Sequence, residues 1–375
     1  MNLPLFKIYW DKNDVEHVNN KITSGEYWCT GKENEIFESK ISEYLEIPYC
    51  ISLNSGGSAL HALMIAHGIG NGDEVIIPSF TFIATAYSPM YTGGKPVFAD
   101  IEDERLGLDP NSVLEAITPK TKAIIPIHYG GIPCKIRELR EIADDHNLIL
   151  IEDAAEAFGA KIKDKKVGTT GDSSIFSFCH NKVFTTSEGG CIVTHDQKIY
   201  DKIKKILSYG RVSEGNYFTT AKGIDYVSLG YNWRLSSILA ALGISQIEKI
   251  DELIDMRRTV AKKLDTKIST IEGISSMEIP KELYAVYQMY SVLMDNNTQR
   301  DKLIEYLLSK DIYSKIYFDP VHKYSVFKDL KLDKIDLPVT EEISSKIITL
   351  PFYPNMSDGE IDYLTSSLKS FRETF

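Results

Sequence analysis

Short apolar runs alternate with helix-like stretches in the first half of the chain. Seven runs are predicted as β-strands: CISLN (50–54), EVIIP (74–78), PVFAD (96–100), AIIPIH (123–128), LILIED (148–153), SIFSF (174–178) and GCIVT (190–194). Several are almost entirely apolar, as is typical of parallel strands that are covered on both faces. Between them, residues 58–68 and 133–147 have helical patterns. The alternation predicts an α/β fold with a mostly parallel, seven-stranded central sheet.

The pattern changes after residue 235. Residues 235–264 carry apolar side chains at three- and four-residue spacing with charges between them, which predicts a long connecting helix. The segment LPFYP (350–354) marks turns in the part that follows. We therefore predict a large domain over residues 1–250 and a smaller α+β domain over residues 251–375.

Composition and charge narrow the functional classes. The 375 residues are 43% apolar and 25% charged, and the net charge is −11. So acidic a chain is not expected to bind nucleic acid or an anionic membrane, although a local pocket can still hold a small anion. The first residues lack the basic start and apolar core of a secretory signal, and no apolar run approaches the ~18–20 residues of a membrane span.

The five cysteines are scattered and form no C-x-x-C pair. This spacing favours reduced thiols in the cytoplasm over a disulfide framework or a zinc site. We therefore expect a cytoplasmic protein without a metal.

Polar residues that follow the predicted strands are candidates for a ligand site, because ligands of open α/β sheets bind at the carboxyl ends of the strands. In NSGGSALHAL (54–63), Gly56 and Gly57 permit close approach of the backbone to an anion. Ser58 is predicted to cap the following helix and to donate its hydroxyl. Taken alone, the stretch is more typical of an ordinary strand-to-helix turn.

Asp153 ends the very apolar run 148–153, so its carboxylate is expected to be half-buried and to require a partner. One interpretation is that it pairs with a cationic ring nitrogen of a bound cofactor. The alternative is that it caps a following helix. Glu156 lies three residues later, on the same side if the segment is helical.

Ser177 and Lys182 follow the next strand and are expected to face the same crevice. A lysine in an apolar pocket favours the neutral amine that forms Schiff bases with aldehydes, although a solvated loop lysine is the commoner situation. Phe82 follows the strand 74–78 and could lie flat against a planar ligand, but most phenylalanines belong to the core.

Together these four places fit one ligand. An anion seat, an aromatic face, a carboxylate for a pyridinium nitrogen and a Schiff-base lysine are what pyridoxal 5′-phosphate (PLP) requires. The sequence therefore predicts PLP chemistry, in which the lysine carries a proton between two carbons as general acid and base.

The chain resembles the DegT/DnrJ family of PLP-dependent sugar-nucleotide aminotransferases, which have the fold-type I architecture of the aspartate aminotransferases. The resemblance spans about residues 4–365 and rests on the order and spacing of several motifs. These motifs are NSGGSALHAL, GDEVIIPSFTFIATA, AIIPIHYGG, IEDAAEAFGA, SFCHNK followed by TTSEGG, LGYNWRLSSILAALGISQIEKID and LPFYPNMSDGEI.

The resemblance implies roles for the candidate residues around the cofactor ring. Lys182 would hold the cofactor covalently, and Asp153 would pair with the pyridine nitrogen. Glu156 would lie near the ring O3′, and Phe82 would stack on the ring.

The resemblance also implies a phosphate site and a partner subunit. Gly57, Ser58 and Ser177 would hold the phosphate. The family forms homodimers with active sites at the subunit interface, so Asn232 in GYNWR would reach the phosphate from the partner chain. His322 in FDPVH would lie near the sugar.

The chain departs from the family pattern at two positions. Many members have threonine at Gly57, and its loss removes a hydroxyl but keeps the backbone donors. Many have glycine at Ser187, and a serine there is mildly strained if the turn needs a positive φ. One branch carries histidine in place of the lysine and removes the sugar C3 hydroxyl. Lys182 therefore favours transamination, and His180 is interpreted as a loop histidine.

We predict a PLP-dependent enzyme that moves an amino group from L-glutamate to a nucleotide-linked keto-sugar for amino-sugar and polysaccharide biosynthesis. The predicted position is C4 of a 4-keto-6-deoxyhexose. Alternatives are transamination at C3, or dehydration or aromatisation as in other members of the family. A non-catalytic regulator with the same fold is less favoured, because Lys182 and Asp153 are both present.

Overall fold

The computed structural model describes residues 1–213, 223–332 and 335–374. The α-helices are α1 (Lys12–Thr23), α2 (Lys32–Leu45), α3 (Gly56–Ala66), α4 (Ile83–Met90), α5 (Pro110–Ala116), α6 (Ile136–Asp145), α7 (Gln197–Ile206), α8 (Ser237–Glu248), α9 (Ile250–Ile268), α10 (Asn297–Ser309), α11 (Ser325–Asp329), α12 (Pro338–Lys346) and α13 (Asp358–Thr374). Short 3₁₀ turns occupy Tyr129–Gly131 and Val321–Lys323.

The strands belong to four sheets. The central sheet contains β1 (Tyr49–Leu53), β2 (Glu74–Pro78), β3 (Lys95–Ala99), β4 (Thr121–Ile124), β5 (Ile149–Asp153), β8 (Ser173–Ser177) and β9 (Gly190–Thr194). The smaller sheets contain β6 (Lys161–Ile162), β7 (Lys165–Lys166) and β13 (Leu283–Tyr284); β10 (Arg211–Ser213) and β11 (Ile224–Tyr226); and β12 (Ile274–Ser276), β14 (Tyr290–Met294) and β15 (Ile347–Leu350).

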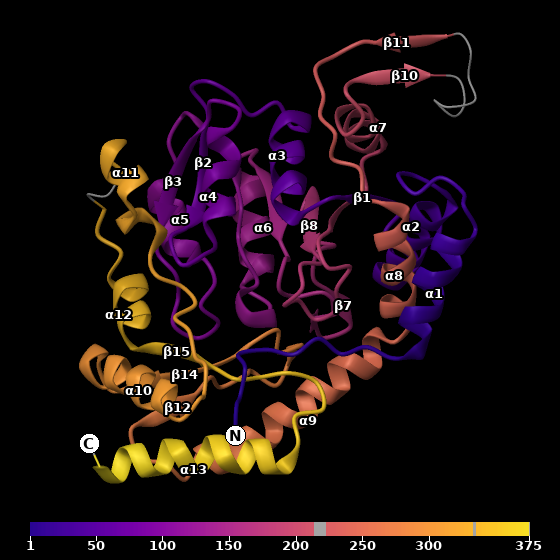
Figure 1. The fold of residues 1–375 in the computed structure, drawn as a ribbon. Coiled ribbons are helices and arrows are strands. Elements are labelled where there is room, and N and C mark those ends of the chain that lie inside the picture. Colours follow the sequence, from indigo (N-terminus) through magenta and orange to yellow (C-terminus); the bar gives the residue numbers. More distant parts are fainter. Residues whose placement is uncertain (214–222, 333–334, 375) are drawn as a thin grey trace.

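The seven predicted strands form one sheet in the order β1-β9-β8-β5-β4-β2-β3 (Figure 1). Neighbours from β3 to β8 are parallel, whereas β9 pairs antiparallel with both β8 and β1. The predicted α/β fold with a mostly parallel seven-stranded sheet is therefore confirmed.

Successive residues of the strands pack on opposite faces of this sheet. In β8, Ile175 joins an apolar cluster with residues of α3 and α7, whereas Phe176 joins one with residues of α2 and α8. Both side chains are buried. Because helices cover both faces, the strands carry apolar residues at successive positions, and this produced the continuous runs in the sequence.

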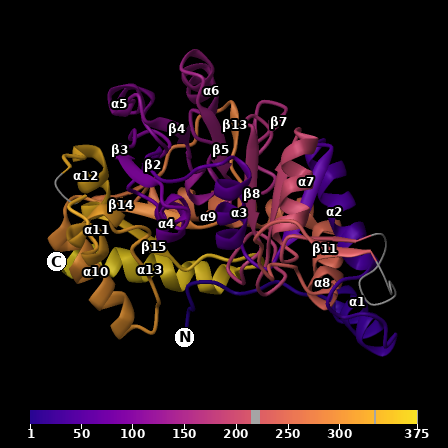
Figure 2. The same cartoon turned by 90° about the horizontal axis from the view of Figure 1, so that it is seen from above.

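The three-stranded antiparallel sheet β12-β14-β15 packs with α9, α10 and α13 around a separate apolar cluster. Figures 1 and 2 both place α10, α11 and α12 at the opposite end of the molecule from α1, α2 and α8. Leu3 also packs in this cluster and bridges Ile312. The division into domains at residue 250 stays a prediction, and Leu3 packs across it.

The single long helix expected over residues 235–264 is two helices, α8 and α9, which are separated at Lys249. Its Nζ lies 2.7 Å from a carboxylate oxygen of Asp11 and 3.0 Å from one of Asp14. The apolar spacing continues through both helices, so the pattern alone did not reveal the break.

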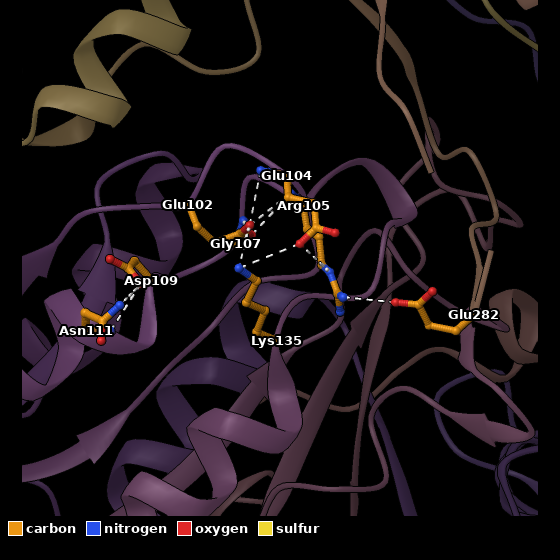
Figure 3. A network of polar contacts seen from close by, with 8 residues as sticks. All are labelled: Glu102, Glu104, Arg105, Gly107, Asp109, Asn111, Lys135 and Glu282. Carbon is orange, nitrogen blue, oxygen red and sulfur yellow. Dashed lines mark hydrogen bonds and ion pairs between the residues drawn. The ribbon is translucent and has the colours of Figure 1, made fainter. Parts of the chain in front are cut away.

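The loop after β3 illustrates how this fold satisfies a buried carboxylate (Figure 3). Glu102 accepts hydrogen bonds from the backbone N–H groups of Arg105 and Gly107, both at 3.2 Å, and Lys135 Nζ lies 3.3 Å away. Arg105 in turn pairs with Glu282 at 3.2 Å. The loop is thereby joined to the segment before β13.

No helix within the described residues has both the length and the apolar character needed to cross a membrane.

Candidate active site

A cavity of about 550 Å³ opens where the chain leaves β1, β2, β5 and β8. Segments from distant parts of the sequence complete it, including Phe6, Lys315 and Tyr317. This is the position expected for a ligand of an open α/β sheet. The structure brings seven of the sequence-predicted residues to its wall: Gly56, Gly57, Phe82, Asp153, Glu156, Ser177 and Lys182.

One wall of the cavity is the N-terminus of α3. The helix begins at Gly56, and Ser55 is its N-cap, so the prediction that Ser58 caps the helix is wrong. Ser58 instead lies inside the first turn and donates its backbone N–H to Ser55 Oγ at 3.0 Å. A Cβ on Gly56 would stand 3.1 Å from Ser177 Cβ, so glycine lets Ser177 approach the helix end. Backbone N–H groups at a helix N-terminus bind anions.

Asp153 lies in the cavity at the end of β5 and is 7% exposed. Its carboxylate accepts hydrogen bonds from Thr85 Oγ1 at 2.8 Å and from the Ala155 N–H at 3.2 Å. Burial raises the pKa of this carboxyl above its ordinary value, and the two hydrogen bonds only partly oppose this effect. Asp153 does not cap a helix, because the segment that follows forms turns.

The preceding residue, Glu152, was missed in the sequence. Its carboxylate is fully buried and accepts hydrogen bonds from the backbone N–H groups of Gly168, Thr170 and Gly171 at 2.7–2.8 Å. His128 Nε2 lies 2.9 Å from it. Burial alone would raise the pKa of Glu152, but the hydrogen bonds from His128 and the backbone hold it below its ordinary value. A glutamate inside an apolar run was the signal, since it too must have partners.

The His128 ring links this network to the cavity, whose wall it also lines. The Cys134 N–H donates to its Nδ1 at 3.1 Å, which places the ring proton on Nε2, facing Glu152. Glu152 and His128 therefore hold each other in place behind the wall.

Lys182 and Glu156 face each other across the cavity. Lys182 Nζ lies 3.5 Å from Glu156 Oε1, and the Gly130 N–H donates to the other carboxylate oxygen at 2.9 Å. Both side chains are largely buried, with 15% and 12% exposed. Lys182 is therefore not a solvated surface lysine. Glu156 reaches this position from a turn and not from a helix, contrary to the condition under which it was predicted.

The backbone around Lys182 is held by residues from far along the chain. Arg257 of α9 donates to the Lys182 carbonyl at 3.5 Å, and Gln288 Nε2 donates to the Asn181 carbonyl at 2.7 Å. Arg257 is buried and also donates to two other backbone carbonyls, at Tyr287 and Gln288. No local signal in the sequence connects these residues to Lys182.

Phe82 immediately precedes α4 and lines the cavity. Its side chain is exposed, with a relative accessibility of 61%. It is therefore not a core phenylalanine. Its stacking on a planar ligand stays a prediction.

Asn232 and His322 are not among the residues that line the cavity. Asn232 forms an isolated β-bridge with Ser208. His322 has no exposed surface, and its Nδ1 lies 2.6 Å from Ser79 Oγ. The structure thus does not bring His322 to the cavity of its own chain, and burial also lowers the pKa of its imidazole.

The structure shows the surroundings of Ser187 and Gly57, the two positions at which the chain departs from the family pattern. Ser187 has a φ of 75°, so the turn does need the left-handed region, where serine is mildly strained. A Cβ on Gly57 would find no atom closer than 3.9 Å. A side chain would thus fit there, and glycine is not required by crowding.

These residues fit PLP. Burial raises the pKa of Asp153 although the charge of Lys182 opposes this effect, and a cationic ring nitrogen would offset the burial further. The first turn of α3 and Ser177 offer donors for a phosphate, and the Lys182 amine lies in the same cavity. The donor set therefore matches each chemical part of the cofactor.

Comparisons with known proteins agree with this geometry. The chain matches the model of the DegT/DnrJ/EryC1/StrS aminotransferase family over residues 9–369. It is 34% identical over 374 residues to the GDP-perosamine synthase of Vibrio cholerae, covering 98% of this chain and 99% of the relative. It is 35% identical over 361 residues to the GDP-perosamine synthase of Caulobacter vibrioides, covering 96% and 95%.

A solved structure extends the likeness to the whole fold. PseC, an aminotransferase of Helicobacter pylori involved in the biosynthesis of pseudoaminic acid, matches with a TM-score of 0.93 and 26% identity, covering 100% of both chains. The family model, the two relatives and the cavity all lead to the same conclusion. The chain belongs to the DegT/DnrJ/EryC1/StrS aminotransferase family and is a transaminase whose cofactor is PLP.

Proposed function

We propose that this enzyme transfers the amino group of L-glutamate to a nucleotide-linked keto-sugar, at C4 of a 4-keto-6-deoxyhexose. The observation that carries the proposal is the meeting of Lys182, Asp153, Glu156 and the N-terminus of α3 in one cavity. The two relatives named as GDP-perosamine synthases support a GDP-linked sugar as the substrate.

The buried side chains divide the work around the cofactor. PLP, when bound, accepts the electron pair released at the substrate carbon. Asp153 keeps a proton on the ring nitrogen, because its carboxylate is buried and needs a cationic partner. Glu156, fixed by the Gly130 N–H, orients the Lys182 amine. Lys182 Nζ then takes a proton from one carbon and returns it to another.

The remaining residues bind and orient. The Ser177 hydroxyl and the first-turn N–H groups of α3 would hold the phosphate, and the exposed Phe82 ring would pack against the cofactor ring. Lys315 lies in the cavity wall, with its Nζ 4.6 Å from the centre of the Tyr317 ring. Its charge favours an anionic substrate despite the acidic chain.

A substrate panel tests the proposal. The enzyme is supplied with L-glutamate and 4-keto-6-deoxyhexoses linked to GDP, UDP or TDP, and 2-oxoglutarate is measured. We expect the highest turnover with the GDP-linked sugar, and NMR of the product should place the amine on C4. Absence of 2-oxoglutarate with every sugar would contradict the proposal.

Lys182→Ala tests the residue itself. We expect loss of turnover and loss of the cofactor bond that borohydride fixes in the unaltered enzyme. Lys198→Ala, at an exposed lysine of α7, is the matched control and should behave as the unaltered enzyme does. Normal turnover in Lys182→Ala would remove Lys182 from the mechanism.

We also propose a homodimer in which Asn232 reaches the cavity of the partner. The strands β10 and β11 project from the body of the molecule (Figure 1). Large apolar side chains on and beside them are exposed, namely Tyr209, Val212, Tyr226, Val227 and Leu229. An exposed apolar surface of this kind marks an interface.

Mixing two inactive variants tests the shared site. If Asn232 serves the partner's cavity, Lys182→Ala and Asn232→Ala chains mixed in equal amounts regain about a quarter of the unaltered activity. The reason is that half of the mixed dimers carry both variants and each of these has one intact site. No recovery after verified subunit exchange would show that Asn232 does not act across the interface.

We place the enzyme in the cytoplasm, as the cysteine pattern predicted. The thiols of its five cysteines are unpaired, which supports a reducing compartment.

A further inference from the structure

Three side chains that the proposed reaction does not use meet at the wall of the cavity. Ligand atoms of Cys179, His180 and Glu188 all lie within 4.8 Å of one another. Cys179 Sγ is 3.4 Å from His180 Nδ1 and 3.6 Å from Glu188 Oε1. All three residues line the cavity. A thiol, an imidazole and a carboxylate are the side chains that bind zinc in proteins.

The antiparallel pairing of β8 and β9 creates this cluster. Ser177 pairs with Gly190, and the Phe178 N–H donates to the Gly189 carbonyl at 2.9 Å. Beyond these residues the ladder does not continue, because the Phe178 carbonyl accepts a hydrogen bond from the Thr186 N–H at 3.0 Å. The connection between the two strands therefore turns back on itself, and Cys179 and Glu188 stand at its two ends.

The third ligand is also oriented by packing. The His180 ring lies 5.1 Å from the Phe6 ring, centre to centre. Ser187, whose positive φ is unusual for serine, directly precedes Glu188 and turns the chain into β9. Cys179 is half-buried, whereas His180 and Glu188 are exposed, so an ion can enter without opening the fold.

The distances agree with one tetrahedral ion. Zinc bonds of about 2.3 Å to sulfur and about 2.0–2.1 Å to nitrogen or oxygen separate neighbouring ligand atoms by about 3.3–3.6 Å. The two sulfur distances, 3.4 and 3.6 Å, meet this requirement. Three protein ligands leave the fourth position open, as in zinc sites that accept water or a substrate atom.

We propose that this chain binds one Zn²⁺ ion through Cys179 Sγ, His180 Nδ1 and Glu188 Oε1, with the fourth position open to the cavity. Binding releases the thiol proton to solvent, so that the thiolate and the carboxylate neutralise the ion. The sequence did not predict this site, because its ligands form no C-x-x-C pair and come from both ends of a connection between strands.

The ion would act on the same turn that carries Lys182. The Lys182 N–H donates to the Cys179 carbonyl at 2.9 Å, so a metal on Cys179 holds this turn rigid. A ligand in the fourth position would also occupy the cavity. Zn²⁺ is therefore an inhibitor of the proposed transamination. This consequence rests on the proposed function, whereas the binding itself does not.

Cobalt titration tests the binding directly. Enzyme dialysed against EDTA is titrated with Co²⁺, which reports thiolate ligation and tetrahedral geometry by its absorbance, and Zn²⁺ is then added as competitor. We expect one Co²⁺ per chain with a thiolate band that Zn²⁺ abolishes. Cys179→Ser should lose the band, and His180→Asn and Glu188→Gln should each bind roughly tenfold or more weakly.

The exposed Cys29 provides the matched control. Cys29→Ser should bind Co²⁺ as the unaltered enzyme does, and the thermal unfolding of every variant shows whether it is folded. Absence of the band in unaltered enzyme, or its persistence in folded Cys179→Ser, would overturn the proposal. Turnover in Cys179→Ser should no longer be inhibited by Zn²⁺, and inhibition equal to that of unaltered enzyme would refute the regulatory consequence alone.

Discussion

On β5, the carboxylates of two successive residues, Glu152 and Asp153, meet opposite surroundings. Glu152 has three backbone donors and an imidazole, and its pKa is lowered. Asp153 has two donors, and its pKa is raised because burial is not compensated. Adjacent strand residues point to opposite faces of the sheet. One carboxylate therefore has partners that offset its burial, whereas the carboxylate of the next residue does not.

The difference separates a carboxylate that stabilises the fold from one that is a candidate for a role in the reaction. A buried charge with all its partners inside the protein contributes to the fold, and removing it leaves its donors without an acceptor. A buried charge whose burial is not offset by its neighbours is a candidate to receive a cationic partner from a ligand. The same contrast appears between Asp153 and Glu102, whose partners in Figure 3 include a lysine.

The largest expected effect is the loss of folding stability when Glu152 is replaced. Glu152→Gln should lower the free energy of unfolding by about 2–4 kcal/mol, because the amide NH₂ cannot accept the hydrogen bonds on its side. Asp153→Asn should change it by less than about 1 kcal/mol in enzyme freed of cofactor. Urea unfolding of both variants measures the two values. If both variants lost the same free energy of unfolding, the distinction between the two carboxylates would be wrong.

The comparison reverses when activity is measured. Asp153→Asn should lower turnover roughly a hundredfold or more, because the ring nitrogen loses the charge that keeps it protonated. Glu152→Gln, assayed where it is folded, should stay within about tenfold of the unaltered rate. Release of 2-oxoglutarate from glutamate measures both. Unchanged turnover in Asp153→Asn would show that Asp153 does not support the ring.

The two carboxyls should also respond to acid with opposite signs. The pKa of Glu152 is lowered from 4.5, so its contribution to stability is present above that value and is lost as the pH falls through the folded-state pKa. The pKa of Asp153 is raised from 3.8, so the folded protein takes up this proton first and gains stability as the pH falls.

The free energy of unfolding of the unaltered enzyme and of both variants, each without cofactor, should therefore be measured from about pH 7 to about pH 3. The deficit of Glu152→Gln should shrink toward acid. Asp153→Asn should become less stable relative to the unaltered enzyme over the same range. Parallel curves for all three proteins would contradict both signs.

The smallest effect concerns single hydrogen bonds to each carboxylate. Thr85→Val removes the 2.8 Å bond to Asp153 and should raise the pKa of Asp153 further, lowering turnover by about two- to tenfold. Ser174→Ala removes a 3.5 Å contact with Glu152 that already has four better donors, and should change stability by less than about 0.5 kcal/mol. A larger loss in Ser174→Ala would show that the donors around Glu152 do not replace one another.

The sequence predicted the strands well, because each is an apolar run covered on both faces. It also predicted that Lys182, Asp153 and Glu156 share one site. Asp153 ends β5, Glu156 follows that strand, and Lys182 follows the neighbouring strand β8. Its errors were local. The cap of α3 is Ser55, because the two glycines lie within the helix, and the break at Lys249 is stabilised by ion pairs with a distant segment.

Contacts between distant residues could not be predicted in the same way. Arg257 reaches the Lys182 carbonyl from α9, and Cys179 meets Glu188 where the connection between β8 and β9 turns back on itself. His322 fits a family motif, but the fold buries it against Ser79. Such relations depend on how elements pack, which a residue pattern of period two or 3.6 does not encode.

The reach of Arg257 has a consequence for engineering. A shortened chain ending at residue 250 would contain every residue proposed to touch the cofactor in one protomer, yet it would lack the guanidinium that holds the peptide carbonyl of the lysine. It would also remove the packing partners of Leu3. The first 250 residues are therefore not expected to form the same site without the rest of the chain. Moving the proposed catalytic lysine onto another scaffold would require residues of the second half of the chain as well.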